Sequence, residues 1–177
     1  TFPYDTASSD AFLVHRITDT APHSDTSEPS SRTGAENSFQ ISVDIDKLSN
    51  PLDRWIVSRV HQLTDHVAKF MNQYNIPDAL SAVIPFIDDA SNWYVRRSRR
   101  RFWKSEDDAD KAQAYQTLHY VLVRLSLVLA PFTPFLAEEL YQHLTGGESV
   151  HLLDWPTDNP VDERVLADMR RTRELIA

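Results

Sequence analysis

Apolar residues recur every three or four positions from residue 51 to the end of the chain, the pattern of helices with one buried face. Asn50 is a good N-cap and Pro51 is a good first-turn residue, so a first helix of about 25 residues is expected to begin there. Its apolar stripe comprises Leu52, Trp55, Ile56, Val60, Leu63, Val67, Met71 and Tyr74.

A second helix is predicted from near Pro77 to about Trp103, with a kink where Pro85 interrupts the backbone hydrogen bonds. On a wheel of about 100° per residue, its apolar face comprises Val83, Phe86, Ile87, Ala90, Trp93 and Tyr94. The opposite side holds Asp88, Asp89, Asn92, Arg96, Arg99 and Arg100. Arg97 and Arg101 turn toward the apolar side, where we expect buried stems and heads paired with carboxylates or carbonyls.

Three more helices are predicted in the C-terminal half of the chain. The third begins after Ser105, a good cap followed by acids, and runs to Leu129. Its apolar lining comprises Ala112, Tyr115, Leu118, Leu122, Leu125 and Val128. The fourth covers residues 134–144 before the Gly146–Gly147 pair, and the last starts near Val161 after an irregular crossing at 150–156. Residues 51–177 therefore predict an all-α fold, an antiparallel helical bundle.

The first fifty residues have a different pattern and form a separate, irregular N-terminal segment. Residues 20–38 are rich in Ser, Thr, Pro and acids and almost free of apolar side chains, which predicts a polar insertion without a packed core. The flanking stretches 11–17 and 39–46 are branched or alternating, a pattern also compatible with a short two-stranded β-ribbon.

Composition narrows the functional classes. The chain has 177 residues, a formal net charge of −8, three glycines and no cysteine. The missing cysteines exclude disulfides, thiolate metal sites and cysteine nucleophiles, and they fit a reducing compartment. His61 and His66 are expected at the surface, and no metal site, phosphate-cradling glycine loop or catalytic motif is predicted. No apolar run is long enough to cross a membrane.

One short stretch of this acidic chain concentrates positive charge between aromatic residues. Residues 92–104 read NWYVRRSRRRFWK. One interpretation is a solvated face with salt bridges to the acids at 106–110. The other is contact with RNA phosphates by Arg96, Arg99, Arg100 and Lys104. In that case Phe102 or Trp103 would offer a flat surface to an exposed base, and composition alone does not choose between the two interpretations.

Four stretches in matching order resemble the anticodon-binding helical domain of isoleucyl-tRNA synthetases, over roughly residues 50–177. They are LDRWIVSRV (52–60), DDASNWYVRRSRRRFW (88–103), LAPFTPFLAEELYQ (129–142) and SVHLLDWP (149–156). The third is shared in outline with the valine and leucine enzymes of this class I subclass, whereas the second is more particular to the isoleucine enzyme. The N-terminal segment does not follow the family pattern.

The resemblance implies a tRNA-binding fragment of an isoleucine–tRNA ligase that acts in the cytoplasm in protein biosynthesis. The catalytic sequence motifs of the family are absent, so the fragment is expected to be inactive. We expect it to need no cofactor itself, because ATP and Mg²⁺ would bind to the missing catalytic domain. Its implied partners are the anticodon stem-loop of isoleucine tRNA and the remaining domains of the parent, with the helix end from Arg99 to Lys104 near the anticodon. Structural roles are expected for Asn92, Trp93, Arg97, Arg101 and Trp155.

A function of another class stays open. The chain could be a helical protein-interaction module whose arginine-rich face docks an acidic partner or other domains of the parent. A salt-dependent preference for isoleucine tRNA would favour RNA binding, whereas a saturable protein partner without any RNA effect would favour this alternative.

Overall fold

The computed structural model describes residues 43–104 and 108–176, which all belong to one compact unit spanning residues 36–177. The helices are α1 (Pro51–Met71), α2 (Ile76–Ser81), α3 (Val83–Asp88), a π-helical segment (Asp89–Val95), α4 (Arg96–Lys104), α5 (Asp108–Leu129), α6 (Pro134–Thr145) and α7 (Glu163–Ile176). Two 3₁₀ turns cover Ile45–Lys47 and Val150–Leu152. No strand occurs in this described part, so the all-α prediction is confirmed there.

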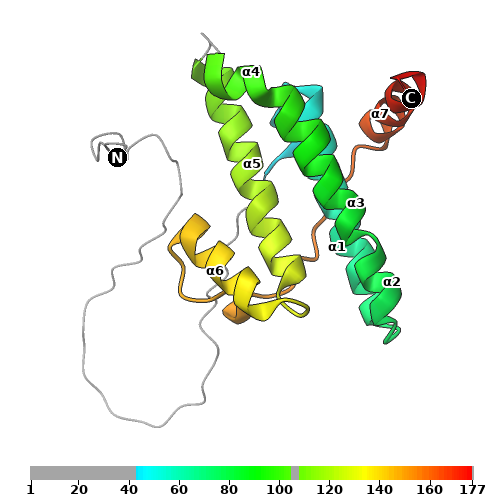
Figure 1. Cartoon of the computed structure of the whole chain (residues 1–177), viewed down its shortest axis with the longest axis vertical. Coiled ribbons are helices and arrows are strands. Elements are labelled where there is room, and N and C mark those ends of the chain that lie inside the picture. Colours follow the sequence, from blue (N-terminus) through cyan, green and yellow to red (C-terminus); the bar gives the residue numbers. More distant parts are fainter. Residues whose placement is uncertain (1–42, 105–107, 177) are drawn as a thin grey trace, which may run out of the picture. The chain divides into compact units, whose positions relative to one another are not determined.

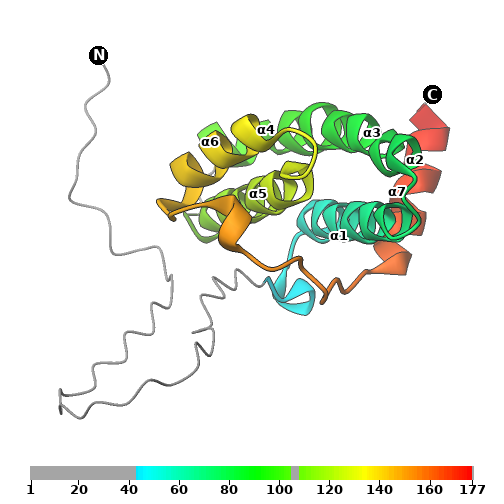
Figure 2. The same cartoon turned by 90° about the horizontal axis from the view of Figure 1, so that it is seen from below.

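The chain reverses direction between α1 and the row of α2, α3 and α4, and again between that row and α5 (Figure 1). The row formed by α2, α3 and α4 runs back along α1, and α5 returns beside α4. Helix α6 packs on the C-terminal part of α5, at the end far from α4 (Figure 1). Helices α1 and α5 lie alongside each other in Figure 2, and α7 packs against α1. The core lies between α1, the row of α2, α3 and α4, and α5.

Helix α1 begins where the sequence predicts. The Asn50 side chain accepts a hydrogen bond from the backbone N–H of Leu52 at 2.9 Å, which caps the first turn. The helix ends at Met71, before the predicted stripe does. Tyr74 lies beyond that end in a left-handed conformation with φ of 55° and is 94% exposed. Tyr74 therefore contributes nothing to the core.

The second predicted helix is interrupted. Proline at 85 has no N–H to donate to the carbonyl of residue 81, and α2 ends at Ser81 while α3 starts at Val83. The π-helical segment follows, and its turns are wider than those of an α-helix. The residues that face the core succeed one another in steps of four: Phe86, Ala90, Tyr94, Ser98 and Phe102. Beyond Asp88 the regular wheel is consequently wrong for Asp89 and Arg97, whereas Tyr94, Arg96, Arg99, Arg100 and Arg101 lie on their predicted sides.

The remaining helices confirm the predicted order with local corrections. In α5, Ala112 and Tyr115 are exposed, whereas Ala114 and Thr117 are buried. Because α5 contacts α1, α4 and α6, it is buried on several sides and no single stripe describes it. Helix α6 ends at Thr145 and is capped by Gly146, whose positive φ of 65° suits glycine.

The predicted N-terminal features lie largely outside the described residues. These include the stretch 11–17, the polar insertion 20–38 and most of 39–46, and the proposed cap at Ser105 is also outside. Where the predicted ribbon enters the described part, Ile45–Lys47 forms a 3₁₀ turn capped by Asp44. The prediction that the second strand extends to residue 46 is therefore wrong.

His61 is buried, contrary to the surface position expected from the sequence, at 1% exposure. Its Nδ1 lies 2.6 Å from the carbonyl oxygen of Pro160, and its Nε2 lies 2.6 Å from the Tyr120 hydroxyl. Arg124 Nε donates to that hydroxyl at 3.0 Å. With Nδ1–H donating to the carbonyl, Nε2 accepts from the tyrosine, so a neutral imidazole links α1, α5 and the segment before α7.

Stability is expected to decrease as the pH falls below the ordinary His pKa. Burial lowers the pKa of His61 from its usual value of 6.5. The unfolded chain therefore binds a proton at this histidine more tightly than the folded chain does. The stabilisation is complete above pH 6.5 and is lost progressively below it. Thermal melts between about pH 7 and pH 5 should show this loss, and His61→Gln should reduce the pH dependence. His143→Gln is the control because His143 is exposed, and an equal effect from both variants would contradict this assignment.

Candidate nucleic-acid interface

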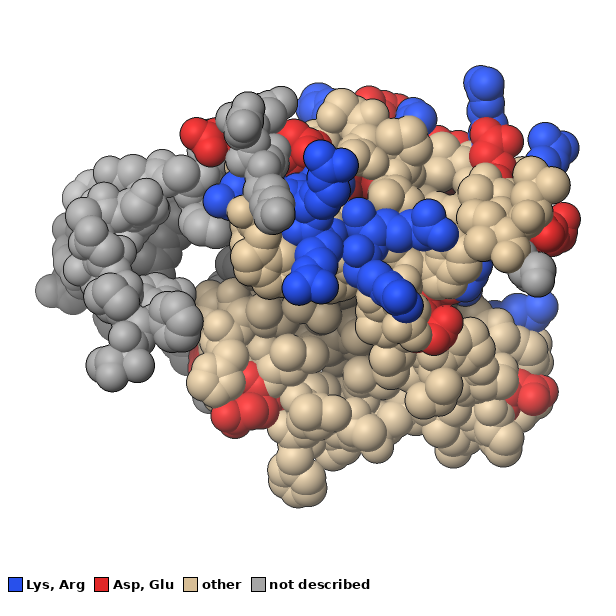
Figure 3. Space-filling model, turned by 45° about the horizontal axis from the view of Figure 1, so that its top comes forward, with Lys and Arg blue, Asp and Glu red and all other residues tan. Residues whose placement is uncertain are grey.

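Lys and Arg side chains gather on the face of the molecule that includes α4 (Figure 3). From α4, Arg96, Arg97, Arg99 and Arg100 are exposed. Trp103, at the end of the same helix, is 70% exposed, and the Arg99 guanidinium carbon lies 5.8 Å from its ring centroid. We call these five residues the arginine face. Four cations beside an exposed indole have the chemistry to contact phosphates and to stack on a base.

Among the described carboxylates after α4, the alternative interpretation of salt bridges holds for Arg101, which pairs with Asp110. Within the described part of the chain, the ion pairs formed by α4 arginines are those of Arg101 with Asp53 and Asp110. Arg96, Arg99 and Arg100 form no ion pair with any described carboxylate. Their charges are therefore directed to solvent and available to an anionic ligand.

Phe102 is not available for stacking. It is only 4% exposed, and its ring packs against Tyr94 and Tyr115 at centroid distances of 6.4 and 5.1 Å. The prediction that either Phe102 or Trp103 offers a flat surface is wrong for Phe102 and leaves Trp103. Lys104 is the last residue of α4, and its side chain lies outside the described residues.

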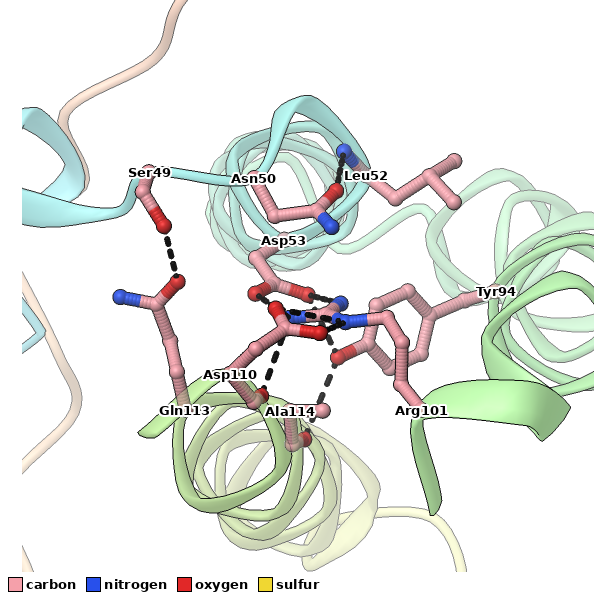
Figure 4. A network of polar contacts seen from close by, with 9 residues as sticks. All are labelled: Ser49, Asn50, Leu52, Asp53, Tyr94, Arg101, Asp110, Gln113 and Ala114. Atoms are coloured by element: carbon pink, nitrogen blue, oxygen red, sulfur yellow. Dashed lines mark hydrogen bonds and ion pairs between the residues drawn. The ribbon is translucent and has the colours of Figure 1, made fainter. Parts of the chain in front are cut away.

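Arg101 anchors α4 to the bundle, as predicted (Figure 4). Its Nη1 and Nη2 donate to the two carboxylate oxygens of Asp53 at 2.7 and 2.8 Å. Its Nε and Nη2 also donate to Asp110 Oδ1, at 2.9 and 2.6 Å. Asp53 belongs to α1 and Asp110 to α5, so one guanidinium joins three helices. This bidentate geometry fixes the position from which the arginine face is presented.

The electrostatics of this network keep Arg101 and Tyr94 protonated. Hydrogen bonding to Asp53 raises the pKa of Arg101 further above its usual range. Burial, and then the nearby Asp53 carboxylate, raise the pKa of Tyr94. Tyr94 therefore keeps its proton and donates it to Asp53 Oδ1 at 2.8 Å. The Asp53 side chain is 0% exposed, and these hydrogen bonds compensate for its burial.

Arg97 is not buried, because the π-helical segment rotates it outward. It is exposed, and its guanidinium carbon lies 4.4 Å from the Trp93 ring centroid. The predicted pairing of its head with a carboxylate or carbonyl is replaced by this cation–π contact. Asn92 Nδ2 donates to Asp88 Oδ1 at 2.6 Å, and Trp155 is half-buried against the core.

Sequence reasoning missed Asp89, which the regular wheel puts on the solvent side. Its side chain is 5% exposed and pairs with Arg59 Nε at 2.9 Å and with Arg173 Nη1 at 2.6 Å. These partners belong to α1 and α7. The available signal is the four-residue step, since Asp89, Trp93 and Arg97 follow one another at that interval. Only knowledge of the π-helical segment would have made that step meaningful.

Residues 53–177 match the model of a family described as the anticodon-binding domain of tRNA ligase. The chain belongs to this family. This chain is 47% identical over 133 residues to an isoleucine–tRNA ligase of Chlamydia trachomatis serovar D. It is 52% identical over 130 residues to one of Dehalococcoides mccartyi strain CBDB1.

These alignments cover 71% and 70% of this chain but only 13% and 12% of the two relatives. The relatives are thus several times longer than the anticodon-binding domain described above. The arginine face falls inside the residues matched by the family.

Among residues 43–104 and 108–176, no group of three or more His, Asp or Glu side chains is arranged to hold a metal ion. None of the helices in this part is long and apolar enough to cross a membrane.

Proposed function

We propose that this anticodon-binding domain recognises the anticodon stem-loop of isoleucine tRNA as part of an isoleucine–tRNA ligase. The observation that carries the proposal is the arginine face, a row of exposed cations beside an exposed indole on a chain of net charge −8. The family supports tRNA as the ligand. The names of the relatives support isoleucine tRNA in particular.

Recognition divides between two kinds of contact. Arg96, Arg99 and Arg100 bind backbone phosphates, where each neutralised phosphate releases condensed counterions. Trp103 stacks on an unpaired base of the loop, with the Arg99 guanidinium beside the same ring. The acidic remainder of the surface disfavours binding of RNA elsewhere on the domain. A titration with the isoleucine stem-loop, followed by amide NMR shifts, should therefore move signals of α4 first.

The catalytic chemistry belongs to other parts of the parent ligase. The parent activates isoleucine with ATP and Mg²⁺ in the cytoplasm and transfers it to the tRNA, and its remaining domains are the second partner of this domain.

The purified chain is expected to show no isoleucine-dependent exchange between ATP and pyrophosphate. Both catalytic sequence motifs of the family are absent from its sequence. The assay is run beside a full-length isoleucine–tRNA ligase as positive control. Exchange activity that purifies with this chain would contradict the assignment to a binding domain.

The alternative, a protein-docking module, has support on other surfaces. Ile84 is 72% exposed and Phe135 is 90% exposed, so apolar contacts with further domains are available away from the arginine face. If the arginine face docks a protein instead, the stem-loop should not bind to the domain. The protein partner should then bind equally well with and without RNA. If the proposal holds, the stem-loop occupies the face and excludes an acidic competitor.

A further inference from the structure

The ring of Trp93 is shared by two arginines that lie far apart in the sequence. The guanidinium carbons of Arg97 and Arg173 each lie 4.4 Å from its centroid. Trp93 belongs to the π-helical segment, Arg97 lies in the first turn of α4, and Arg173 lies near the end of α7. Planar guanidinium groups stack on indole rings and gain cation–π energy as well as packing. The ring therefore connects the arginine face with α7.

Arg173 itself is firmly held. Its Nη1 is 2.6 Å from Asp89 Oδ1, and its guanidinium carbon is 5.9 Å from the ring centroid of the buried Trp55. Arg59 Nε binds the other oxygen of Asp89 at 2.9 Å. Asp89 thus has two cationic partners, one from α1 and one from α7. These contacts tie the last turn of α7 to the π-helical segment that directly precedes α4.

We propose that Arg173 is a positioning residue for the arginine face: through Trp93 it sets where the Arg97 guanidinium and the first turn of α4 lie. The consequence for RNA rests on the proposed function. Arg173 is 31% exposed, in contact with Asp89, and acts on the interface through another side chain. Coupling of this kind is reciprocal, so RNA bound to the arginine face also strengthens the docking of α7.

The first test detects the contact between the Arg97 guanidinium and the Trp93 ring in the absence of RNA. The Nε–H signal of Arg97 reports its place over the Trp93 ring, because the ring current shifts protons that lie above an indole. Arg173→Lys keeps a positive charge near Asp89 but removes the planar group, so it separates stacking from charge. We expect this variant to stay folded and to shift the Arg97 signal.

Arg171→Lys is the matched control for the NMR test. Arg171 lies on the same helix with a side chain 78% exposed and its nearest carboxylate, Asp168, 3.8 Å away. It should leave the Arg97 signal unchanged. An Arg97 signal that is the same in Arg173→Lys as in the original chain would overturn the proposal.

The second test measures the effect on RNA. Arg173→Gln should weaken binding of the isoleucine anticodon stem-loop about threefold to tenfold, the range of indirect couplings, while the slope of log affinity against log salt stays the same. Arg171→Gln, with the same loss of charge, should change neither quantity. A slope reduced by about one counterion would show that Arg173 contacts a phosphate directly, and an unchanged affinity would show no coupling; either result overturns the proposal.

The two tests separate this inference from the proposed function. If the original chain binds no stem-loop, the proposed function fails, while the Arg97 signal still decides whether Arg173 positions the first turn of α4. If the chain binds RNA but the signal does not respond to Arg173→Lys, the positioning role alone fails.

Discussion

Replacing Arg101 with alanine is expected to lower the free energy of unfolding by about 3–5 kcal/mol, the usual result of removing one partner of a buried ion pair. The Arg101 side chain is 11% exposed and that of Asp53 is 0% exposed. Without the guanidinium, Asp53 keeps a hydrogen bond from Tyr94 but loses its only described cationic partner. Equilibrium urea unfolding followed by circular dichroism measures the loss directly.

Arg100→Ala is the matched control for this prediction. Arg100 is the preceding residue on the same helix, it is exposed, and it has no described ion-pair partner. Its replacement should change stability by no more than about 0.5 kcal/mol. If Arg101→Ala unfolds like the original chain, or if Arg100→Ala is the destabilised variant, the side-chain directions along α4 given above are wrong.

Replacing Arg96, Arg99 and Arg100 together with alanine is expected to weaken binding of the isoleucine anticodon stem-loop about a hundredfold at moderate salt. Three lost phosphate contacts should reduce the salt dependence by about two counterions, at roughly 0.7 per phosphate of single-stranded RNA. The three side chains are exposed, so the fold should remain intact. Fluorescence anisotropy of a labelled stem-loop over a series of salt concentrations gives both quantities.

The control for the triple variant removes the same charge from another helix. Arg164, Arg170 and Arg171 are exposed on α7 and lie outside the arginine face. Their joint replacement with alanine should reduce affinity only through the weaker long-range field, with less change in the salt slope. Equal losses from both triple variants would indicate a diffuse electrostatic attraction rather than a defined interface.

Local signals in the sequence account for most of the fold. Asn50 marks the start of α1 because its side chain can cap the first turn, and Gly146 marks the end of α6 because it accepts a positive φ. These signals depend on neighbouring residues alone. The buried place of Arg101 was also predictable, since an arginine on an apolar face needs carboxylate partners.

The remaining errors have one main physical source. A regular wheel assumes about 100° per residue, and the π-helical segment makes the turns wider. After it, Arg97 turns outward, and Phe102 turns inward. The pairing of Asp89 with Arg173 depends on the packing of α7, which no local pattern contains. The wheel separates Arg101 from Arg96, Arg99 and Arg100, but the exposure of Arg97 and the burial of Phe102 depend on the π-helical segment.

The central claim is that the arginine face recognises the anticodon stem-loop of isoleucine tRNA. The most direct measurement is the affinity of the chain for this stem-loop and for a stem-loop of equal length from another tRNA, at the same set of salt concentrations. We predict at least about tenfold tighter binding of the isoleucine stem-loop, weakened by salt and by loss of the three arginines. Equal affinity for both stem-loops, or no binding of either, would contradict the claim.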